Sequence, residues 1–285
     1  MDINTLRQHL AQRDTFSILE TVDVHTGVRT VLREFGYVIE APNWTRDGRQ
    51  LVYNSRGRMY TYELATGATQ EIDTGFASDC NNDHVLSPDN TQLAISHFTN
   101  ADATSRIYIL PLQGGNPVLV TEKGHSFLHG WSPDGKRLAY CAPRNGQFDI
   151  YTIAVDGSEG GTETQLTNLP GLDDGPEYSP DGSHIWFNST RSGLMQVWRM
   201  EVDGSSPTQM VNEDANCWFP HISPDGNWVV YIAYNKNDVA PGDHPANKNV
   251  ALHLISAAGG ESKTIARFFG GQGTINVKCQ FLGTR

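Results

Sequence analysis

Basic residues are few in this sequence and are not gathered into a patch. The 285 residues include 21 Lys and Arg against 32 Asp and Glu, which gives a formal net charge of -11. Proteins that bind nucleic acid usually present a basic face that displaces counterions from the phosphates. We therefore expect no nucleic-acid partner, and an anionic membrane surface is an equally poor match.

Long hydrophobic runs are absent too. No stretch approaches the roughly 18 apolar residues of a membrane-spanning helix, and the N-terminal residues contain no apolar core typical of a secretory signal peptide. We expect no membrane insertion and a cytoplasmic location, or a periplasmic location if a leader has been removed from the sequence.

Cysteine is scarce and unclustered. Cys80, Cys141, Cys217 and Cys279 form no Cys-x-x-Cys pair, which excludes a zinc ribbon. A chain of this length can bury roughly three quarters of its unfolded surface without disulfides, so we expect free thiols. The sequence also lacks a Gly-x-Ser-x-Gly elbow, a His-Glu-x-x-His motif and a phosphate loop ending in Gly-Lys-Ser/Thr. Their absence argues against the enzyme classes that these motifs mark.

What the sequence does contain is a turn signal that recurs along the chain. It takes the forms Thr-Arg-Asp-Gly, Ser-Pro-Asp-Asn and then Ser-Pro-Asp-Gly, at intervals of 42 to 47 residues, and is centred on Asp47, Asp89, Asp134, Asp181 and Asp225. Pro presets φ, Asp hydrogen-bonds to nearby backbone, and Gly or Asn accepts a positive φ. Each signal therefore predicts a tight hairpin.

Each turn is followed by the same strand pattern. The fourth to sixth residues after the Asp are apolar, for example Leu138, Ala139 and Tyr140, so these strands are apolar on both faces, as a sheet stacked between two neighbours requires. A third strand carries an aromatic side chain in four of the units, at Tyr60, Tyr108, Tyr151 and Trp198. A Gly-containing turn then leads to a short fourth strand. Four strands in a unit of about 40 to 47 residues are typical of a propeller blade.

The two ends of the chain supply a sixth unit. Ser17–Val24 and Val28–Leu32 look like a third and a fourth strand, and residues 274–281 look like a first strand. Pairing them in one blade closes the ring and removes exposed sheet edges. We therefore predict one all-β domain, a six-bladed β-propeller over residues 16–285 that is closed by an incomplete blade from both termini. Residues 1–15 are expected to form an N-terminal extension with a short helix.

These repeats, Ser-Pro-Asp-Gly followed by an apolar triplet, resemble the propeller repeats of the TolB family over about residues 16–280. They are also similar to the propellers of prolyl oligopeptidases and oligogalacturonate lyases. The resemblance implies the fold, because such propellers host unrelated activities. The N-terminal domain of TolB has no counterpart here, so the resemblance does not imply a Tol–Pal role. The lyases hold a divalent metal with His and Gln side chains, but no lyase motif aligns residue by residue.

Polar residues gather toward one face of the predicted ring. In a four-stranded blade, the loop before the first strand and the loop after the second strand lie on the same face, here named the strand-entry face. His84 and His129 each precede their turn Asp by five residues, so we expect them at equivalent places in adjacent blades. The candidate ligand-binding residues in these loops are Asn82, Asp83, His84, His129, Asp173, Asp174, Arg191, Trp218, His221, His244 and Gln272. The alternative is that these side chains only hydrogen-bond to loop backbone and ordered water.

Two functions remain open at this point. The first is a binding module that holds a protein, a peptide or a small ligand at the strand-entry face. The second is a metal-dependent carbohydrate-active enzyme, either a lyase or a hydrolase. In that enzyme His84, His129 and His221 would hold a divalent ion, and Arg144 or Arg191 would hold an anionic sugar. A divalent metal ion is the only cofactor suggested, and no catalytic residue is assigned.

Overall fold

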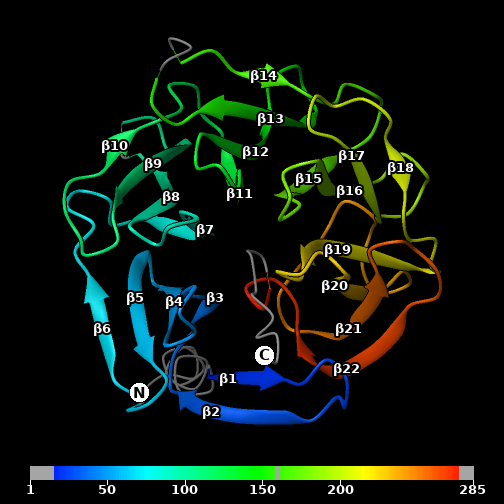
Figure 1. The fold of residues 1–285 in the computed structure, drawn as a ribbon, viewed down its shortest axis with the longest axis horizontal. Coiled ribbons are helices and arrows are strands. Elements are labelled where there is room, and N and C mark those ends of the chain that lie inside the picture. The colour runs from blue at the N-terminus through cyan, green and yellow to red at the C-terminus, as the bar shows by residue number, and fades with distance from the viewer. Residues whose placement is uncertain (1–15, 100, 158–160, 276–285) are drawn as a thin grey trace, which may run out of the picture.

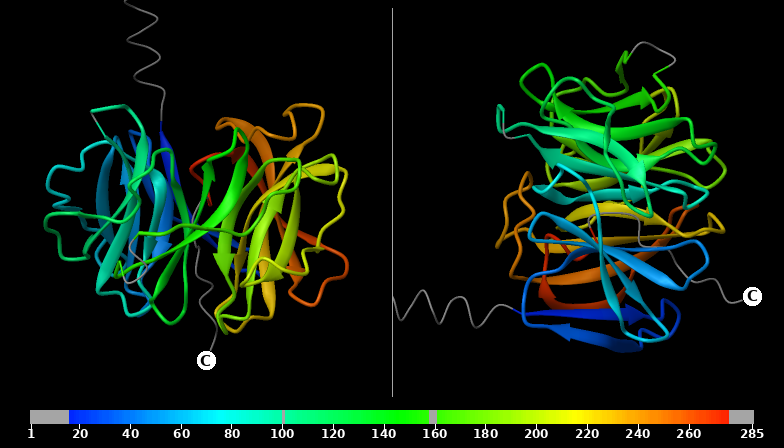
Figure 2. Two further views of the ribbon diagram at one scale, coloured as in Figure 1. Left: turned by 90° about the horizontal axis from the view of Figure 1, so that it is seen from above. Right: turned by 90° about the vertical axis from the view of Figure 1, so that its left-hand side faces the viewer.

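The computed structural model describes residues 16–99, 101–157 and 161–275. These residues contain strands and no helix, and they form a β-propeller whose blades stand around a central axis (Figure 1). The strands run between the two faces of the ring (Figure 2). The predicted all-β propeller is therefore confirmed. The short helix predicted within residues 1–15 lies outside the described residues.

Five sheets have four antiparallel strands each. The first two of these blades are made by β3 (Glu40–Trp44), β4 (Gln50–Ser55), β5 (Arg58–Glu63) and β6 (Thr69–Ile72), and by β7 (Cys80–Leu86), β8 (Gln92–Phe98), β9 (Ser105–Pro111) and β10 (Val118–Leu119). The third blade contains β11 (Phe127–Trp131), β12 (Arg137–Pro143), β13 (Phe148–Ala154) and β14 (Thr164–Gln165).

The remaining two complete blades follow the same order. They are made by β15 (Asp173–Tyr178), β16 (His184–Ser189), β17 (Gln196–Glu201) and β18 (Thr208–Gln209), and by β19 (Ala215–Ile222), β20 (Trp228–Asn235), β21 (Lys248–Ser256) and β22 (Lys263–Gly270). In every blade the first strand lies nearest the axis (Figure 1). The innermost strands are thus β3, β7, β11, β15 and β19.

The repeated Ser-Pro-Asp-Gly signal forms the hairpin between the first and second strands. In the third blade Ser132 Oγ donates to Asp134 Oδ1 at 2.6 Å, the backbone N of Lys136 donates to the same oxygen at 3.1 Å, and Arg137 N donates to Ser132 Oγ at 2.9 Å. The same contacts recur at the other four turns. The side chains therefore fix each hairpin locally, as the sequence predicted.

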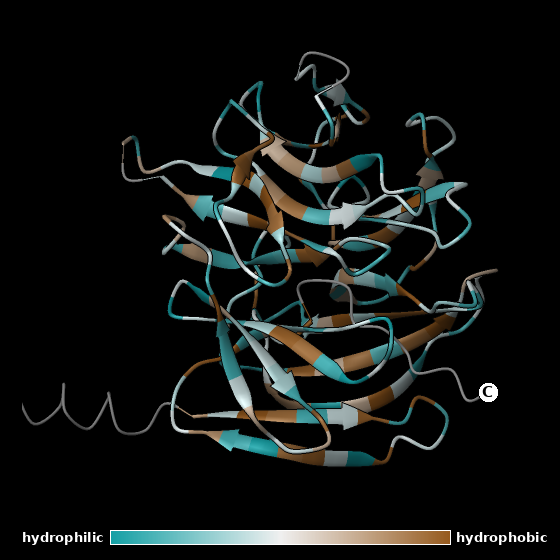
Figure 3. Ribbon diagram, turned by 60° about the vertical axis from the view of Figure 1, so that its left-hand side comes forward, coloured by the Kyte–Doolittle hydropathy of each residue, from teal (hydrophilic) through white to brown (hydrophobic). Residues whose placement is uncertain are grey.

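The hydrophobic core lies between blades rather than inside any one of them. In β20, Val229, Tyr231 and Ala233 pack toward the preceding blade, whereas Val230 and Ile232 belong to a cluster on the opposite face of the sheet. Alternate residues of a strand point to opposite faces, so a blade between two neighbours needs an apolar residue at every position. Figure 3 shows hydrophobic residues along the strands and hydrophilic residues in many connecting loops.

A two-stranded sheet fills the place between the first and last complete blades. It consists of β1 (Ser17–Val22) and β2 (Arg29–Phe35). Leu19 and Phe35 pack against the β3–β6 blade, and Val22 packs against the cluster of the β19–β22 blade. Leu19 and Phe35 therefore contact one neighbouring blade and Val22 the other, so the position of this sheet in the ring is set by packing on both sides.

The described residues give five complete blades and this two-stranded sheet, not six blades. A short segment after β22 lies between the innermost strands β3 and β19: the O of Gly273 accepts from Ala41 N at 2.6 Å, and the O of Ile275 contacts His221 Nε2. Of the C-terminal strand predicted over residues 274–281, the described residues include only 274 and 275, and no strand is assigned to these two. The strand that would complete a sixth blade is for this reason not among those observed.

Candidate functional site

Every innermost strand carries an irregularity in its pairing with the second strand. The pairing shifts between Glu40 and Asn43, Cys80 and His84, Leu128 and Gly130, Asp174 and Glu177, and Trp218 and His221. A bulge leaves residues unpaired and re-aims their side chains. Most of the candidate residues that we placed in loops before the first strand lie instead within these strands, at or beside the bulges.

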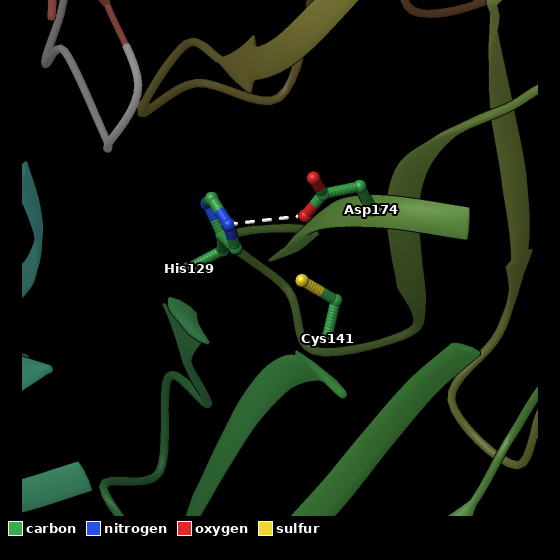
Figure 4. A group of neighbouring side chains, drawn as sticks. All are labelled: His129, Cys141 and Asp174. Atoms are coloured by element: carbon green, nitrogen blue, oxygen red, sulfur yellow. Dashed lines mark ion pairs between the residues drawn. The ribbon is translucent and has the colours of Figure 1, made fainter. Parts of the chain in front are cut away.

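Three side chains from two adjacent blades converge near the axis (Figure 4). His129 Nε2 of β11 lies 3.2 Å from Asp174 Oδ1 of β15, and Cys141 of β12 lies beside them. One ligand atom from each residue lies within 4.8 Å of the other two. Among the described residues this is the one group of three or more His, Cys, Asp or Glu side chains close enough to share a metal ion.

Two buried carboxylates of this site differ in their electrostatics. The pKa of Asp83 is raised to about 6, mainly by burial; the charges of Asp174 and Glu40 contribute to the rise, and His129 and the hydrogen bond from Asn81 oppose it. Burial alone would also raise the pKa of Asp174. The hydrogen bond and the charge of His129, together with His244, outweigh that effect and lower the Asp174 pKa to about 2. Asp174 is therefore a permanent anion, whereas Asp83 titrates near neutral pH.

Cys141 and His244 complete what we name the axial cluster: Asp83, His129, Cys141, Asp174 and His244. Burial raises the pKa of the Cys141 thiol well above its ordinary value, and Asp174 and Asp83 add to the rise. A thiol with a raised pKa is a poor nucleophile, so the cluster does not resemble a cysteine-protease centre. Burial lowers the pKa of His244, with Asp174 opposing.

Aromatic rings form one wall of the axial cluster. Phe219 stacks on His129, with ring centroids 5.8 Å apart, and His244 packs against Trp218 at 4.3 Å. Phe219 has a φ of 54°, and its N donates to Asn188 Oδ1 at 3.1 Å. A positive φ is uncommon for a bulky residue, so this contact and the bulge hold the ring where it stacks. Both aromatic side chains are at most 2% exposed, which leaves neither open to stack on a sugar.

His84 does not join the axial cluster, although its spacing from the turn matches that of His129. His84 pairs opposite Ile95, after the bulge in β7, whereas His129 is itself the unpaired residue of the β11 bulge. His84 is fully buried, its Nε2 lies 3.3 Å from Val52 O, and burial lowers its pKa to about 4. Although His84 and His129 are equally far from their turns in sequence, their side chains therefore occupy different places in the fold.

His221 is also held elsewhere. Its Nδ1 lies 2.7 Å from Glu177 Oε2, and its Nε2 contacts Ile275 O. Both ring nitrogens are therefore already engaged by the protein. Of the three histidines predicted to hold a metal, the structure places only His129 in a group that could do so.

The remaining candidates occupy varied positions. Asp173 forms an ion pair with Arg191 at 2.7 Å, and Asn82 is buried beside the cluster in β7. Gln272 is linked by its backbone N to Pro245 O at 3.4 Å. Arg144, the other expected sugar ligand, pairs with Glu163 at 2.6 Å. Both arginines are thus neutralised by buried or half-buried carboxylates.

Sequence reasoning did not place Cys141, Glu177 or Glu40 near the site. Cys141 lies on the second strand of its blade, and the sequence indicated only that it is a free thiol. Glu177 and Glu40 lie on first strands, and the bulges in those strands cannot be recognised from the amino-acid composition. The spacing from the turn could have identified Glu177, because Glu177 and His221 each precede their turn Asp by four residues.

A groove of about 800 Å³ lies on the β19–β22 blade, away from the axial cluster, and none of the predicted site residues lines it. Lys236 at its edge pairs with Asp214. His253, which also lines the groove, lies 2.8 Å from Glu213. Lys236 and His253 are thus each paired with a carboxylate of the protein, which leaves them less available to a ligand than the residues of the axial cluster.

The blades, the turn signal and the inter-blade core define an all-β propeller of the TolB-like class. The family model for PD40, the TolB beta propeller domain, matches residues 84–267. The chain therefore belongs to the TolB β-propeller family. No helix among the described residues is long and apolar enough to cross a membrane.

Similarity to proteins of Agrobacterium extends over nearly the whole chain. An uncharacterised protein of Agrobacterium fabrum (strain C58) is 45% identical over 261 residues, which cover 91% of this chain and 87% of the relative. The solved structure of a TolB-like protein from Agrobacterium tumefaciens is 44% identical, covers 93% of both chains and has a TM-score of 0.87.

Proteins with a named role are more distant. The Tol-Pal system protein TolB of Francisella tularensis is 31% identical over 130 residues, but these cover only 44% of this chain and 29% of that protein. An oligogalacturonate lyase solved with manganese is 16% identical, covers 89% of this chain and 73% of the lyase, and has a TM-score of 0.56, so it shares the fold alone. None of these relatives supports the cytoplasmic location expected from the sequence.

Proposed function

We propose that this propeller is a binding module and that its ligand site is the axial cluster. The observation that carries the proposal is the convergence of Asp83, His129 and Asp174 from three adjacent innermost strands. Buried carboxylates are costly unless they are paired, and a fold-stabilising core does not need them. A binding role gives a reason for their presence.

The chemistry of the cluster favours a ligand with a cationic group. Asp83 and Asp174 supply two carboxylates, and the lowered pKa of His244 keeps that imidazole neutral at pH 7. The access is narrow, because Asp83 is 5% and His129 6% exposed. A Lys or Arg side chain of a peptide or protein partner, or a small amine, fits this combination better than a flat apolar ligand. The membership in the TolB family supports a protein or peptide as the larger ligand.

A defined peptide library tests this proposal. Displayed linear peptides are selected on the wild-type protein, and the selected sequences are synthesised and titrated by calorimetry. We expect an enrichment in Lys or Arg, and a loss of affinity of at least tenfold in His129→Ala and Asp174→Asn. His25→Ala, which changes an exposed histidine in the β1–β2 turn, serves as the matched control. Selected peptides that bind all variants equally would contradict the proposal.

The metal-dependent carbohydrate enzyme has less support as the alternative. Its expected sugar ligands, Arg144 and Arg191, are held in ion pairs. The donor set His129, Cys141 and Asp174 contains a thiol, which does not suit manganese. Incubation with oligogalacturonate and Mn²⁺, followed by ultraviolet absorbance of an unsaturated product, would reveal a lyase.

We further propose that β1 and β2 belong to a sixth blade whose innermost strand comes from the C-terminal end of the chain. The packing of this sheet against both neighbours and the place of Gly273 and Ile275 between β3 and β19 support that reading. Ring closure of this kind removes the open edge of β1.

A further inference from the structure

We propose that the axial cluster holds a zinc ion, with His129 Nε2, Cys141 Sγ and an Asp174 carboxylate oxygen as its protein ligands. This donor set differs from the three histidines that the sequence suggested. The inference shares His129 and Asp174 with the proposed binding function. A zinc ion on Asp174 takes up that carboxylate, so in the metal-loaded protein Asp83 alone remains to pair with a cationic ligand. Metal binding and peptide binding are measured separately, so either proposal can fail without the other.

The geometry of the three donors suits a small tetrahedral ion. One ligand atom from each residue lies within 4.8 Å of the others, and the His129–Asp174 distance is 3.2 Å. Zinc bonds of about 2.0–2.3 Å in a tetrahedral site place ligand atoms roughly 3.5 Å apart. The observed spacings, 3.2 Å for one pair and at most 4.8 Å for the others, bracket that value.

The donors are held in place by the fold around them. They come from β11, β12 and β15, so the site joins two blades. Gly175 N donates to Asp174 Oδ1 at 2.7 Å, and Phe219 stacks on the His129 ring. Such supporting contacts orient ligands before the metal arrives, as in other zinc sites.

The donor types select the metal. Thiolate sulfur is a soft ligand, imidazole is intermediate, and carboxylate is hard. Together they match zinc, whereas magnesium, calcium and manganese prefer oxygen donors. The manganese of the structurally similar lyase is therefore not the ion that this cluster fits.

His244 provides an independent observation. It neighbours both His129 and Asp174 electrostatically, and its Nδ1 is buried without a hydrogen-bond partner among the described residues. Buried polar nitrogens normally have a partner. His244 lies outside the group of donors whose ligand atoms are all within 4.8 Å of one another, so this nitrogen supports the presence of a bound group at the cluster but is not counted among the protein ligands.

The binding step balances without any oxidant or reductant. The Cys141 S–H bond breaks, its proton passes to solvent, and the sulfur electron pair forms the bond to zinc. The proton on His129 Nε2 that faces Asp174 also leaves: it passes to solvent when the imidazole is charged and is replaced by one on Nδ1 when the imidazole is neutral, so that the Nε2 lone pair bonds to the ion. Each ion bound therefore releases one proton from Cys141, and a second one from His129 when that imidazole is charged.

Cobalt substitution tests the donor set directly. The full-length protein is freed of metal with a chelator and titrated with Co²⁺ alone. We expect one equivalent to give the intense visible bands of a tetrahedral ion and a sulfur-to-cobalt charge-transfer band in the near ultraviolet. Zinc should displace the cobalt. Cys141→Ser should abolish the charge-transfer band, and Asp174→Asn should weaken binding at least tenfold.

Cys217→Ser is the matched control, because Cys217 is also a buried free thiol but lies outside the cluster. This variant should keep the full spectrum. If Cys141→Ser does not fold, X-ray absorption on the zinc-loaded wild type should still show one sulfur neighbour at about 2.3 Å, and Asp174→Asn should still weaken Co²⁺ binding.

A wild-type spectrum without the sulfur band, or a band that survives in folded Cys141→Ser, overturns the zinc site. Measuring selected peptides in the presence of chelator separates the two proposals. Peptide binding that persists when Co²⁺ gives no band leaves the binding function standing and rejects only the metal.

Discussion

His129 Nε2 and Asp174 Oδ1 lie 3.2 Å apart and join two blades through their innermost strands. The pair is almost fully enclosed, with side-chain exposures of 6% and 14%. Removing one partner of such a buried ion pair strongly destabilises the fold, because the remaining charge is left without a partner. This contact therefore links the electrostatics of the site to the stability of the ring.

We predict that Asp174→Asn lowers the free energy of unfolding by about 2–3 kcal/mol at pH 7. The folded pKa of about 2 is below the ordinary value of an aspartate, so the stabilisation is fully present above about pH 4 and is lost as the pH falls through about 2. Urea unfolding of wild type and variant at pH 7 and pH 3 measures both effects. Asp79→Asn, at an exposed position, is the control and should change little. A difference that stays constant between the two pH values would refute the linkage.

At Asp83 we expect the opposite dependence of stability on pH, because its pKa is raised rather than lowered. Its folded pKa of about 6 is raised, so the protonated acid is the stable form and the fold loses stability as the pH rises from about 4 through 6. Asp83→Asn removes that ionisation while keeping an oxygen to accept from Asn81, which now donates at 2.6 Å. We predict a gain of up to about 2 kcal/mol at pH 8 that shrinks toward pH 5.

Denaturant unfolding of Asp83→Asn at the two pH values checks the gain. A variant that is less stable than wild type at pH 8 would show that the burial of this carboxylate is compensated by contacts we have not identified. A stabilising change at a ligand site is expected to reduce binding, so the same variant should bind the selected cationic peptides more weakly.

How much of the structure could be predicted from the sequence differs between the turns and strands on one side and the site on the other. The Ser-Pro-Asp-Gly turns act through contacts within five residues, for instance Ser132 with Asp134 and Arg137, so their structure could be read locally. The same holds for the alternation of β20, because a strand between two blades must be apolar at each position. Local chemistry therefore sufficed for the fold and its family.

The site was harder to predict because it depends on bulges. His84 and His129 are equally spaced from their turns, yet the bulge precedes one and includes the other. Nothing in the composition of these strands marks that difference. Cys141 came to the cluster from a second strand, where it stands one residue after the apolar triplet Leu138–Tyr140 and carries no signal of its own. Asp83, His129, Asp174 and His244 were identified, but which of the histidines meets a carboxylate was settled only by the register.

The buried pair of Glu177 and His221 should be structural rather than ligand-binding. Glu177 Oε2 lies 2.7 Å from His221 Nδ1, Glu177 Oε1 accepts from Ile222 N at 3.2 Å, and both side chains are about 4% exposed. Glu177→Ala should cost about 3–5 kcal/mol of unfolding free energy. Glu177→Gln keeps one oxygen to accept from Ile222 N, and its amide nitrogen can donate to a neutral His221 Nδ1, so it should cost less.

A double-mutant cycle with His221→Ala measures the coupling between the two residues. We expect an interaction energy of at least about 1 kcal/mol, together with unchanged affinity for the selected peptides in any folded variant. Lost affinity in Glu177→Gln at full stability would instead place this pair in the ligand site.

The last prediction concerns ring closure by β1 and β2. Leu19 and Phe35 of this sheet are each 2% exposed against the β3–β6 blade, and Arg29 Nη1 donates to Arg267 O of β22 at 3.2 Å. Deleting residues 1–32 removes β1 and most of β2, and therefore uncovers apolar faces of both neighbouring blades. We expect a lower melting temperature and a tendency to aggregate, because exposed apolar faces and open sheet edges associate.

Deleting residues 1–13 is the matched control, since it leaves both strands whole. Thermal unfolding followed by circular dichroism, with light scattering for aggregation, compares the two truncations with the full chain. The shorter deletion should melt close to the full chain, and the longer one should melt clearly below it. Equal melting temperatures for the 1–32 deletion and the full chain would mean that the five complete blades hold the ring without β1 and β2. The packing of Leu19, which the longer deletion removes, would then contribute nothing to closure.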